Sequence, residues 1–456
     1  MEQQLLNISP VDGRYKKNTE EVSKYFSEYN LIKNRIFVEI EWLKKLLSIN
    51  EISNIKINSN KKLKEEIKLL DRIVNEFNIN EAKRVKEIEN TTKHDVKAVE
   101  YYIDEKLKEY GLEKFTHLVH FACTSEDINN LAYGVMENEL VNIVYIENIN
   151  NLLKLLKEKS KQYASIAMLS HTHGQNATPT TVGKEMAVFA YRIEKMLEKL
   201  KLEKLTGKFN GTVGNFNAHI VAYPNIDWIK TAKEFVESFN LEYNMYTTQI
   251  ESHDNICSVL SRIKLLNNVI LDLNNDMWMY ISRDYFLQNN VKGEVGSSVM
   301  PHKINPINFE NSMANVKMAN AIINVLTENL QVSRMQRDLS DSSLQRNIGM
   351  IIAYSLIAIK QTIIGINKLT VNKEKLLKEL TETPEVLAEA VQTILRKNGY
   401  KDAYEILKGL TRGKHITMKE INEFIKELNI ESNDKKKLLN LKPSDYVGLA
   451  EKIAKI

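Results

Sequence analysis

Side chains that could bind an anion and move protons are concentrated in a few polar segments of this 456-residue chain. Because loops carry function more often than the elements that hold them, these segments are the first place to look for a site. They are SPVDGRY (9–15), TTKHDV (91–96), CTSEDINN (123–130), SHTHGQNATPTTVGKE (170–185), GSSVMPHKINPINFEN (296–311) and, further downstream, SRMQRDLSDSSLQR (333–346).

Together the segments supply hydroxyls, imidazoles, fixed cations and amides. Arginine matches a carboxylate or a phosphate in bidentate fashion, and histidine gives or takes a proton near neutral pH. The combination indicates a site that binds a strongly anionic small molecule and transfers protons on it. The groups concerned are Thr124, Ser125, Ser297, Ser298, His94, His173, Arg14, Lys303, Arg337, Arg346, Asn305 and Asn311, and we add the amide of Gln249, which lies outside these segments.

Each segment taken alone is also typical of an ordinary turn or helix cap. Ser125 followed by Glu126 and Asp127 is a common start of a helix, and Asp95 and Glu126 could equally be solvated surface charges. The segment GKFNGTVGN (207–215) lacks the preceding strand of a phosphate-binding loop, so it predicts a tight turn between helices. A serine hydrolase would need a G-x-S-x-G turn, which does not accompany these serines.

His171 and His173 are two residues apart, which in an extended segment places them on one face. A shared metal would be possible there, but no neighbouring Cys, Asp or Glu completes a ligand set. The pattern favours one histidine that serves a site and one that is structural, and no metal is expected.

Long stretches with apolar residues at every third and fourth position predict a mostly α-helical protein. The clearest are Val141–Ala164, Ile256–Tyr285 and Asn347–Leu369. Helices that are apolar over so much of their surface are usually buried on several sides, which predicts a long helical bundle. We expect three domains, which span residues 1–114, 115–369 and 370–456.

Composition excludes several classes of function. Hydrophobic residues make up 43% and charged residues 27% of the chain, the balance of a globular protein. The net charge of +4 is too small to argue for nucleic acid or a membrane surface. The N-terminal MEQQLLNISP does not have the pattern of a signal peptide, and no apolar run is expected to span a membrane. Cys123 and Cys257 are expected to be reduced thiols in a cytosolic-type protein.

The segment GSSVMPHKINPINFE resembles the signature of the fumarase/aspartase superfamily, G-S-S-x-M-P-x-K-x-N followed by Glu. The other motifs narrow this resemblance to the adenylosuccinate lyase family, in its longer bacterial-type branch, from about Ser9 to the last residues. They are SPVDGRY, TTKHDVKAVEYY, HFACTSEDINN, THGQNATPTTVGKEM, GNFNAH, TTQIE and QRDLSDSSLQRN.

The resemblance implies an all-α, three-domain fold with a long central helical bundle. It also implies β-elimination of fumarate from adenylosuccinate to give AMP, and from succinylaminoimidazole carboxamide ribotide (SAICAR) to give AICAR, in purine nucleotide biosynthesis. No cofactor is implied. The family assembles as a homotetramer whose active sites each take loops from three subunits, and a cytoplasmic location is expected.

By the same resemblance, Ser297 is the base and His173 the acid that protonates the leaving nitrogen. Lys303 would stabilise the serine alkoxide, and Glu310 would orient His173. The substrate-binding residues implied are Arg14, Tyr15, Lys93, His94, Asp95, Thr124, Ser125, Gln249, Ser298, Asn305, Asn311, Arg337, Ser342 and Arg346.

Two positions depart from the family pattern. Lys93 stands where the family usually has Asn, and it adds a charge near an anionic substrate. Asn176 replaces the usual Pro after THGQ, which predicts a looser turn beside His173. The alternatives are a sister enzyme such as argininosuccinate lyase or aspartase, a scaffold protein that has lost catalysis, and a helical nucleic-acid binder, which the small net charge disfavours.

Overall fold

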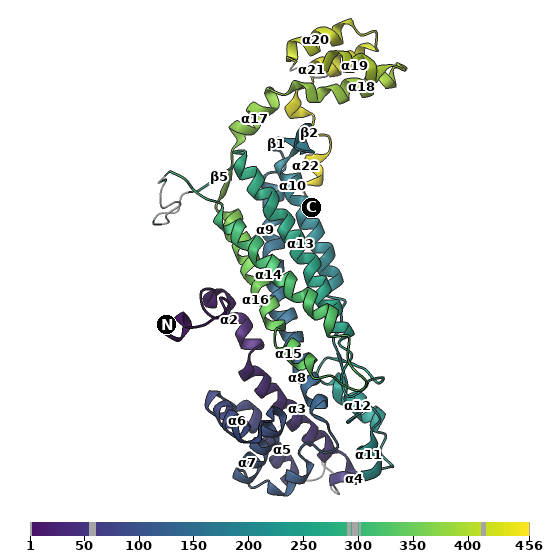
Figure 1. Cartoon of the computed structure of the whole chain (residues 1–456). Helices are drawn as coiled ribbons and strands as arrows, with labels where there is room; N and C mark the ends of the chain where they lie inside the picture. Colours follow the sequence, from purple (N-terminus) through teal and green to yellow (C-terminus); the bar gives the residue numbers. More distant parts are fainter. Residues whose placement is uncertain are drawn as a thin grey trace. The chain divides into compact units, whose positions relative to one another are not determined.

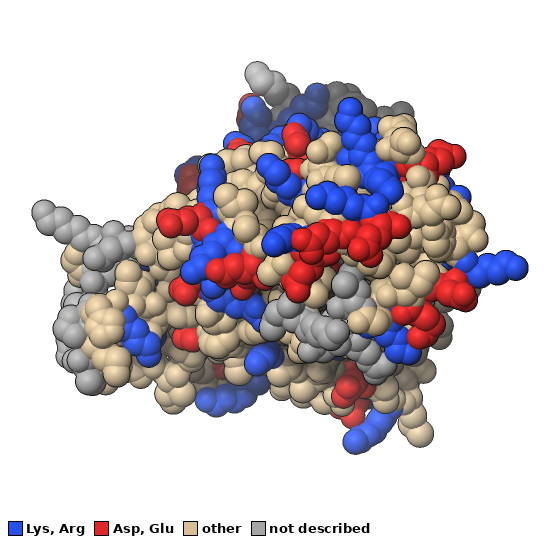
Figure 2. Space-filling model, turned by 90° about the horizontal axis from the view of Figure 1, so that it is seen from above, with Lys and Arg blue, Asp and Glu red and all other residues tan. Residues whose placement is uncertain are grey.

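The computed structural model describes residues 2–53, 61–289, 293, 300, 302–411 and 416–455. Ser297 and Ser298 lie outside the described residues. Helices dominate the described ranges and strands are short (Figure 1), which confirms the predicted all-α class. On the face drawn in Figure 2, acidic and basic side chains are interspersed, in keeping with the net charge of +4.

The chain forms two compact units. Unit 1 comprises residues 1–148, 197–267 and 315–358, and unit 2 comprises residues 149–196, 268–314 and 359–456. The boundaries fall inside helices that continue from one unit into the other: α9 (Ile146–Gln162), α10 (Val182–Leu200), α13 (Asp254–Ser282), α14 (Ile307–Asn329) and α16 (Ile348–Asn367). The predicted division into three domains stays a prediction.

Unit 1 begins with the short helices of the N-terminal segment and includes the loops that follow α10. Its described elements are α1 (Glu2–Leu5), α2 (Lys16–Tyr25), α3 (Glu28–Ser48), α4 (Asn50–Ser53), α5 (Lys61–Asn75), α6 (Ile79–Thr92), α7 (Asp95–Glu109), the 3-10 helix η2 (Glu113–Leu118), α8 (Ser125–Glu139), the π-helix η3 (Leu140–Tyr145), β3 (Thr206–Gly207), α11 (Asn217–Ala222), α12 (Trp228–Glu237), β4 (Glu242–Tyr243) and α15 (Ser340–Gln345).

Unit 2 contains a β-hairpin, a second strand pair and the C-terminal helices. Its described elements are β1 (Ala167–Thr172), β2 (Gln175–Thr181), β5 (Phe286–Gln288), β6 (Leu369–Val371), α17 (Lys373–Thr381), η4 (Pro384–Leu387), α18 (Ala388–Lys397), α19 (Ala403–Thr411), α20 (Met418–Glu427), α21 (Ser432–Asn440), η5 (Pro443–Asp445) and α22 (Ala450–Ile453). Strands β1 and β2, and strands β5 and β6, pair antiparallel, whereas β3 and β4 of unit 1 pair parallel.

The long apolar helices pack together along their lengths, as their periodicity predicts. Buried polar side chains connect them: in unit 2, Asn274 of α13 donates to Ser312 of α14 and to Thr362 of α16, at 3.1 and 3.0 Å. In unit 1, Asn267 donates to Ser355 at 3.0 Å. A buried amide needs such partners, so these contacts also fix the alignment of the helices.

Within the described residues, one helical stretch, Ser340–Asn367, is long and apolar enough to cross a membrane by length and composition, and its most apolar window has a mean hydropathy of 1.7. However, 72% of its most apolar window is buried inside the protein, as in a core helix.

Candidate active site

His173 lies at the exposed tip of the hairpin formed by β1 and β2. Thr172 pairs with Gln175, so His173 and Gly174 form a two-residue turn. Their φ angles are 54° and 75°. A tight hairpin turn of this kind needs positive φ at both central residues, which glycine accepts and histidine tolerates less readily. The hairpin therefore presents the imidazole of His173 away from the core of unit 2.

His171 has a different environment from His173. Its Nε2 lies 2.8 Å from Nη1 of Arg283. Because a guanidinium only donates, the imidazole nitrogen accepts this bond. Partial burial, and then the charge of Arg283, lower the pKa of His171. One histidine is thus tethered to the body of unit 2 while the other is exposed.

Asn176, which was expected to loosen the turn, lies outside it. Asn176 stands in β2 directly opposite His171, so its backbone belongs to the strand pair and not to the two-residue loop. The missing proline therefore leaves the turn that carries His173 intact.

The described end of the signature segment leads into α14. Lys303 is exposed and its backbone N–H donates to the carbonyl of Met300 at 3.0 Å. Asn305 is half-buried, and Glu310 and Asn311 lie in the first turns of α14. Within the described part of unit 2, the polar contact of Glu310 is a 3.2 Å hydrogen bond from the indole of Trp278, and not a contact with His173.

The Lys93–Asp95 segment is the junction between α6 and α7. Lys93 is left-handed, with φ of 56°, and its N–H closes α6 by donating to Glu89. His94 caps α7 by accepting, at Nδ1, the backbone N–H of Lys97 at 3.2 Å. Asn adopts the left-handed conformation more readily than Lys, which explains why an Asn is suited to position 93.

Asp95 begins a continuous polar network in unit 1. Its Oδ2 accepts from Arg35 at 2.7 Å and from Arg346 at 3.3 Å. Burial alone would raise the pKa of Asp95, but the charge and hydrogen bond of Arg35, aided by Val96 N–H and Arg346, hold that pKa below its ordinary value. Asp95 is therefore not a solvated surface charge.

The network continues from Arg35 into α8. Arg35 donates to Asn129 at 2.8 Å, and Asn129 donates to Glu126 at the same distance. Glu126, only 3% exposed, accepts in turn from Arg337 at 3.0 Å. Glu126 is thus a buried ion-pair partner, which corrects its interpretation as a possible surface charge.

The segment after Ser333 supplies the other end of this network. Arg337 also lies 3.6 Å from Asp341, whose Oδ1 accepts the N–H of Ser342 at 2.7 Å. Arg346 donates to Glu28 at 2.7 Å. The structure therefore brings Asp95, Arg337 and Arg346 into one connected set.

Thr124, Ser125 and Gln249 lie around a second polar centre of unit 1, the buried ion pair of Asp127 and Lys208. Thr124 caps α8, and its backbone N–H donates to Asp127 at 2.9 Å, as the sequence around Ser125 indicates for a helix start. The N–H of Gln249 donates to the carbonyl of Gln336 at 3.2 Å, which ties it to the segment that bears Arg337.

The N-terminal SPVDGRY segment forms compact turns before α2. The N–H of Gly13 donates to Ser9, and that of Tyr15 to Pro10, at 3.0 and 2.9 Å. Arg14 is exposed and Tyr15 is half-buried.

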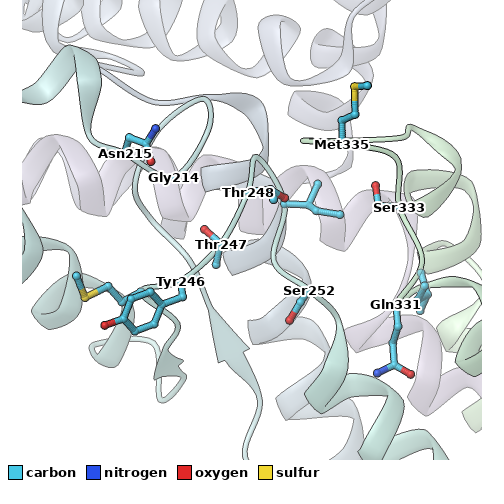
Figure 3. A pocket seen from close by; sticks show the side chains of 12 residues that line it. Gly214, Asn215, Tyr246, Thr247, Thr248, Ser252, Gln331, Ser333 and Met335 are labelled. Carbon is cyan, nitrogen blue, oxygen red and sulfur yellow. The ribbon is translucent and has the colours of Figure 1, made fainter.

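A cavity of about 500 Å³ lies in unit 1 beside Gln249. Figure 3 shows that its walls come from three segments, one with Gly214 and Asn215, one with Tyr246 and Thr247, and one with Gln331 and Ser333. The residues that line it are uncharged. Its chemistry therefore suits a neutral part of a ligand better than a phosphate or carboxylate.

The sequence did not indicate the residues that hold the predicted site residues in place through polar contacts in the folded chain. They are Glu28, Arg35, Asp127, Asn129, Lys208 and Asp341. The signal available for two of them was position: Asp127 is the third residue of a helix start, and Lys208 stands between the glycine and phenylalanine of GKFNG.

Comparisons with known proteins support the resemblance over the full chain. A lyase family model matches residues 13–322, and a model described as adenylosuccinate lyase C-terminal matches residues 333–447. Curated adenylosuccinate lyases of Buchnera aphidicola (subsp. Schizaphis graminum) and Haemophilus influenzae are 47% and 45% identical over 98% of this chain, and over 98% and 97% of their own lengths. The adenylosuccinate lyase of Escherichia coli K12 is 44% identical over 98% of this chain and 97% of its own.

Solved structures agree in fold. A fumarate lyase from Mesorhizobium sp. BNC1 superposes with a TM-score of 0.76 at 14% identity, covering 95% of this chain and 96% of its own. Fold and matched motifs together define a lyase of the fumarase/aspartase superfamily. Within that class, the chain belongs to the adenylosuccinate lyase family.

Proposed function

We propose that this chain catalyses the β-elimination of fumarate from adenylosuccinate to give AMP, and the same elimination from SAICAR to give AICAR. The observation that carries the proposal is similarity over nearly the whole chain, at 44–47% identity, to bacterial proteins named adenylosuccinate lyase. No cofactor is part of the proposed chemistry.

The charge distribution of unit 1 supports a substrate with a phosphate and two carboxylates. Arg337 and Arg346 are both held by carboxylates, at 3.0 and 2.7 Å, so their guanidiniums are oriented before a ligand arrives. The N-terminus of α8, a 15-residue helix, adds a partial positive charge beside Thr124 and Ser125. We assign the phosphate to the arginines and the succinyl carboxylates to the start of α8.

In the proposed reaction Ser297, as an alkoxide stabilised by Lys303, removes the proton from the succinyl carbon next to a carboxylate. The electron pair delocalises into that carboxylate, then forms the carbon–carbon double bond of fumarate as the C–N bond breaks. His173 gives its proton to the departing nitrogen, and Glu310 of another subunit would orient it. Fixed cations and N–H donors that meet the developing carboxylate charge lower the barrier most.

We propose that the site is completed by assembly into a homotetramer. Exposed apolar side chains on the long helices support this: Trp278 and Met279 on α13, Met318 and Val325 on α14, and Ile364 on α16 are 38–49% exposed. Single exposed apolar residues are normal, but several of them on the long helices support an interface with other copies of the chain. Sedimentation should give a tetramer. If sites are shared, mixing the impaired His173→Ala and Arg337→Met chains should restore part of the lost activity.

We also propose a cytoplasmic location, which the free thiols of Cys123 and Cys257 support.

The proposed function is tested by incubating the purified chain with adenylosuccinate, and separately with SAICAR, while fumarate and the nucleotide product are quantified by chromatography. Equal amounts of the two products are expected from each substrate. Argininosuccinate and aspartate serve as controls, and release of fumarate from either one in place of adenylosuccinate would identify a sister enzyme.

A further inference from the structure

Lys208 lies in the GKFNGTVGN segment, an irregular connection that contains the predicted tight turn, in which the N–H of Gly214 donates to the carbonyl of Gly211 at 3.4 Å. Gly207 ends the short strand β3, and an irregular segment follows to α11. The side chain of Lys208 is 0% exposed. Its ammonium contacts Asp127 Oδ1 at 3.0 Å, the carbonyl of Gly211 at 3.1 Å and the carbonyl of Gln249 at 2.7 Å. An ammonium has three protons, so all of them have partners here.

Asp127 on α8 is the partner of Lys208 in this ion pair, and its side chain is also 0% exposed. Besides Lys208, its carboxylate accepts backbone N–H groups of Thr124, Asn210 and Gly211, at 2.9, 3.0 and 3.1 Å. The backbone of Lys208 is fixed as well, because its N–H donates to Asn130 of α8 at 2.8 Å. The ion pair thereby joins the start of α8 to the segment after β3.

The same segment lies so close to residues 247–249 that a side chain at position 214 would not fit. Gly214 has φ of 81°, and a Cβ there would lie 2.3 Å from the carbonyl oxygen of Thr247. The close approach and the Lys208–Gln249 bond together hold residues 247–249 against the start of α8.

We propose that Lys208, through its pairing with Asp127, is a positioning residue that sets the distance between Gln249 and the Thr124–Ser125 helix start. This rests on the proposed function, in which Gln249, Thr124 and Ser125 contact the succinyl-bearing substrate. Lys208 itself has no free proton and no exposed surface, so it acts through these neighbours and does not touch the substrate.

The test compares Lys208→Met and Lys208→Gln with the wild-type chain, with adenylosuccinate as substrate. Met keeps the stem and removes every donor, while the Gln amide can restore part of the hydrogen bonding. Asp127 keeps its bonds from backbone N–H groups in both variants, so both are expected to fold. Lys44→Met is the matched control, because Lys44 pairs with Glu41 and Asp71 in the same unit, outside the site.

Lys208→Met loses the charge-assisted hydrogen bond that holds Gln249. We expect its KM to rise by about tenfold or more. The change in kcat should be smaller, Lys208→Gln should fall between Met and wild type, and the control should keep the wild-type KM. The effects of Lys208→Met and Gln249→Ala should also be less than additive, because both act on the same contact.

A folded Lys208→Met with wild-type KM, or full additivity with Gln249→Ala, would overturn the inference. Failure of both Lys208 variants to fold would overturn it too, since the residue would then be structural. Absent turnover by the wild-type chain would instead refute the proposed function, and the inference with it.

Discussion

Replacing Glu137 by Gln should stabilise the protein in alkaline solution. Glu137 on α8 is 5% exposed and lines a small cavity with Tyr133, Glu251 and His253. Burial, and then the nearby charge of Glu251, raise the pKa of Glu137 from 4.5 to about 8. The folded state therefore keeps a proton that the unfolded chain has released at any pH between these values.

The sign and size of the effect follow from proton linkage. Below pH 4.5 both states hold the proton and folding carries no cost. As the pH rises towards 8, the unfolded chain loses its proton and stability falls by about 1.4 kcal/mol per pH unit. Over the whole interval the loss reaches about 5 kcal/mol, of which about 4 kcal/mol falls between pH 5 and pH 8. Gln does not titrate, so Glu137→Gln lacks this loss.

The assay is calorimetric unfolding at pH 5 and pH 8, at one fixed chain concentration. The Tm of Glu137→Gln should exceed that of the wild type by several degrees at pH 8 and by much less at pH 5, on the order of 2 °C for each kcal/mol. Glu147→Gln, at an exposed position on α9, should keep the pH dependence of the wild type. Parallel curves for Glu137→Gln and wild type would show that Glu137 is ionised in the folded protein.

Three further predictions concern Lys93, Arg35 and His219. Lys93→Asn should raise the free energy of unfolding by about 0.5–1 kcal/mol in chemical denaturation, because Asn tolerates the left-handed conformation better; a decrease would show that the Lys93 side chain is stabilising. Arg35→Met should raise KM by about tenfold while leaving a folded tetramer, because it leaves Asp95 without its main partner; an unchanged KM would separate Asp95 from substrate binding. Burial lowers the pKa of His219 to about 4, so the neutral side chain stabilises the protein fully above pH 6.5, and stability should decline by about 3 kcal/mol as the pH falls to 4. Denaturation of His219→Phe should lack that decline, and an equal decline in both chains would contradict the prediction.

The helical elements were predictable because burial imposes a 3.6-residue period on the sequence. The pattern over Ile256–Tyr285 matches α13, which the structure places at Asp254–Ser282, and Asn347–Leu369 matches α16 at Ile348–Asn367. The ends differ by a few residues because helix ends depend on local contacts. Beyond the end of α13, Phe286 of β5 pairs with Val371 of β6.

The polar networks were not predictable, because their members are distant in sequence. Arg35 and Asp95 are 60 residues apart, and Arg337 and Glu126 are 211 apart. A charged residue gives no local sign that it will be buried, and burial with partners is uncommon enough that a surface position is the ordinary expectation. Only the packing of α3, α7 and α8 reveals that Arg35 and Glu126 have left solvent.

His173 illustrates the intermediate case. The spacing of His171 and His173 indicated that one would serve a site, but not which one or why. The strand register decides the environments of both residues: it places His171 within reach of Arg283 and leaves His173 in the turn. The resemblance supplied the role, and the turn geometry gives a physical reason why the residue is accessible.

The most direct test of the account is the rate of fumarate release from adenylosuccinate by the wild-type chain and by His173→Ala, measured on preparations that sediment identically. The account predicts fumarate and AMP in equal amounts from the wild type, and turnover lower by about 10²–10⁴ in the variant. Absence of fumarate from the wild type, or equal turnover by the two chains, would contradict it.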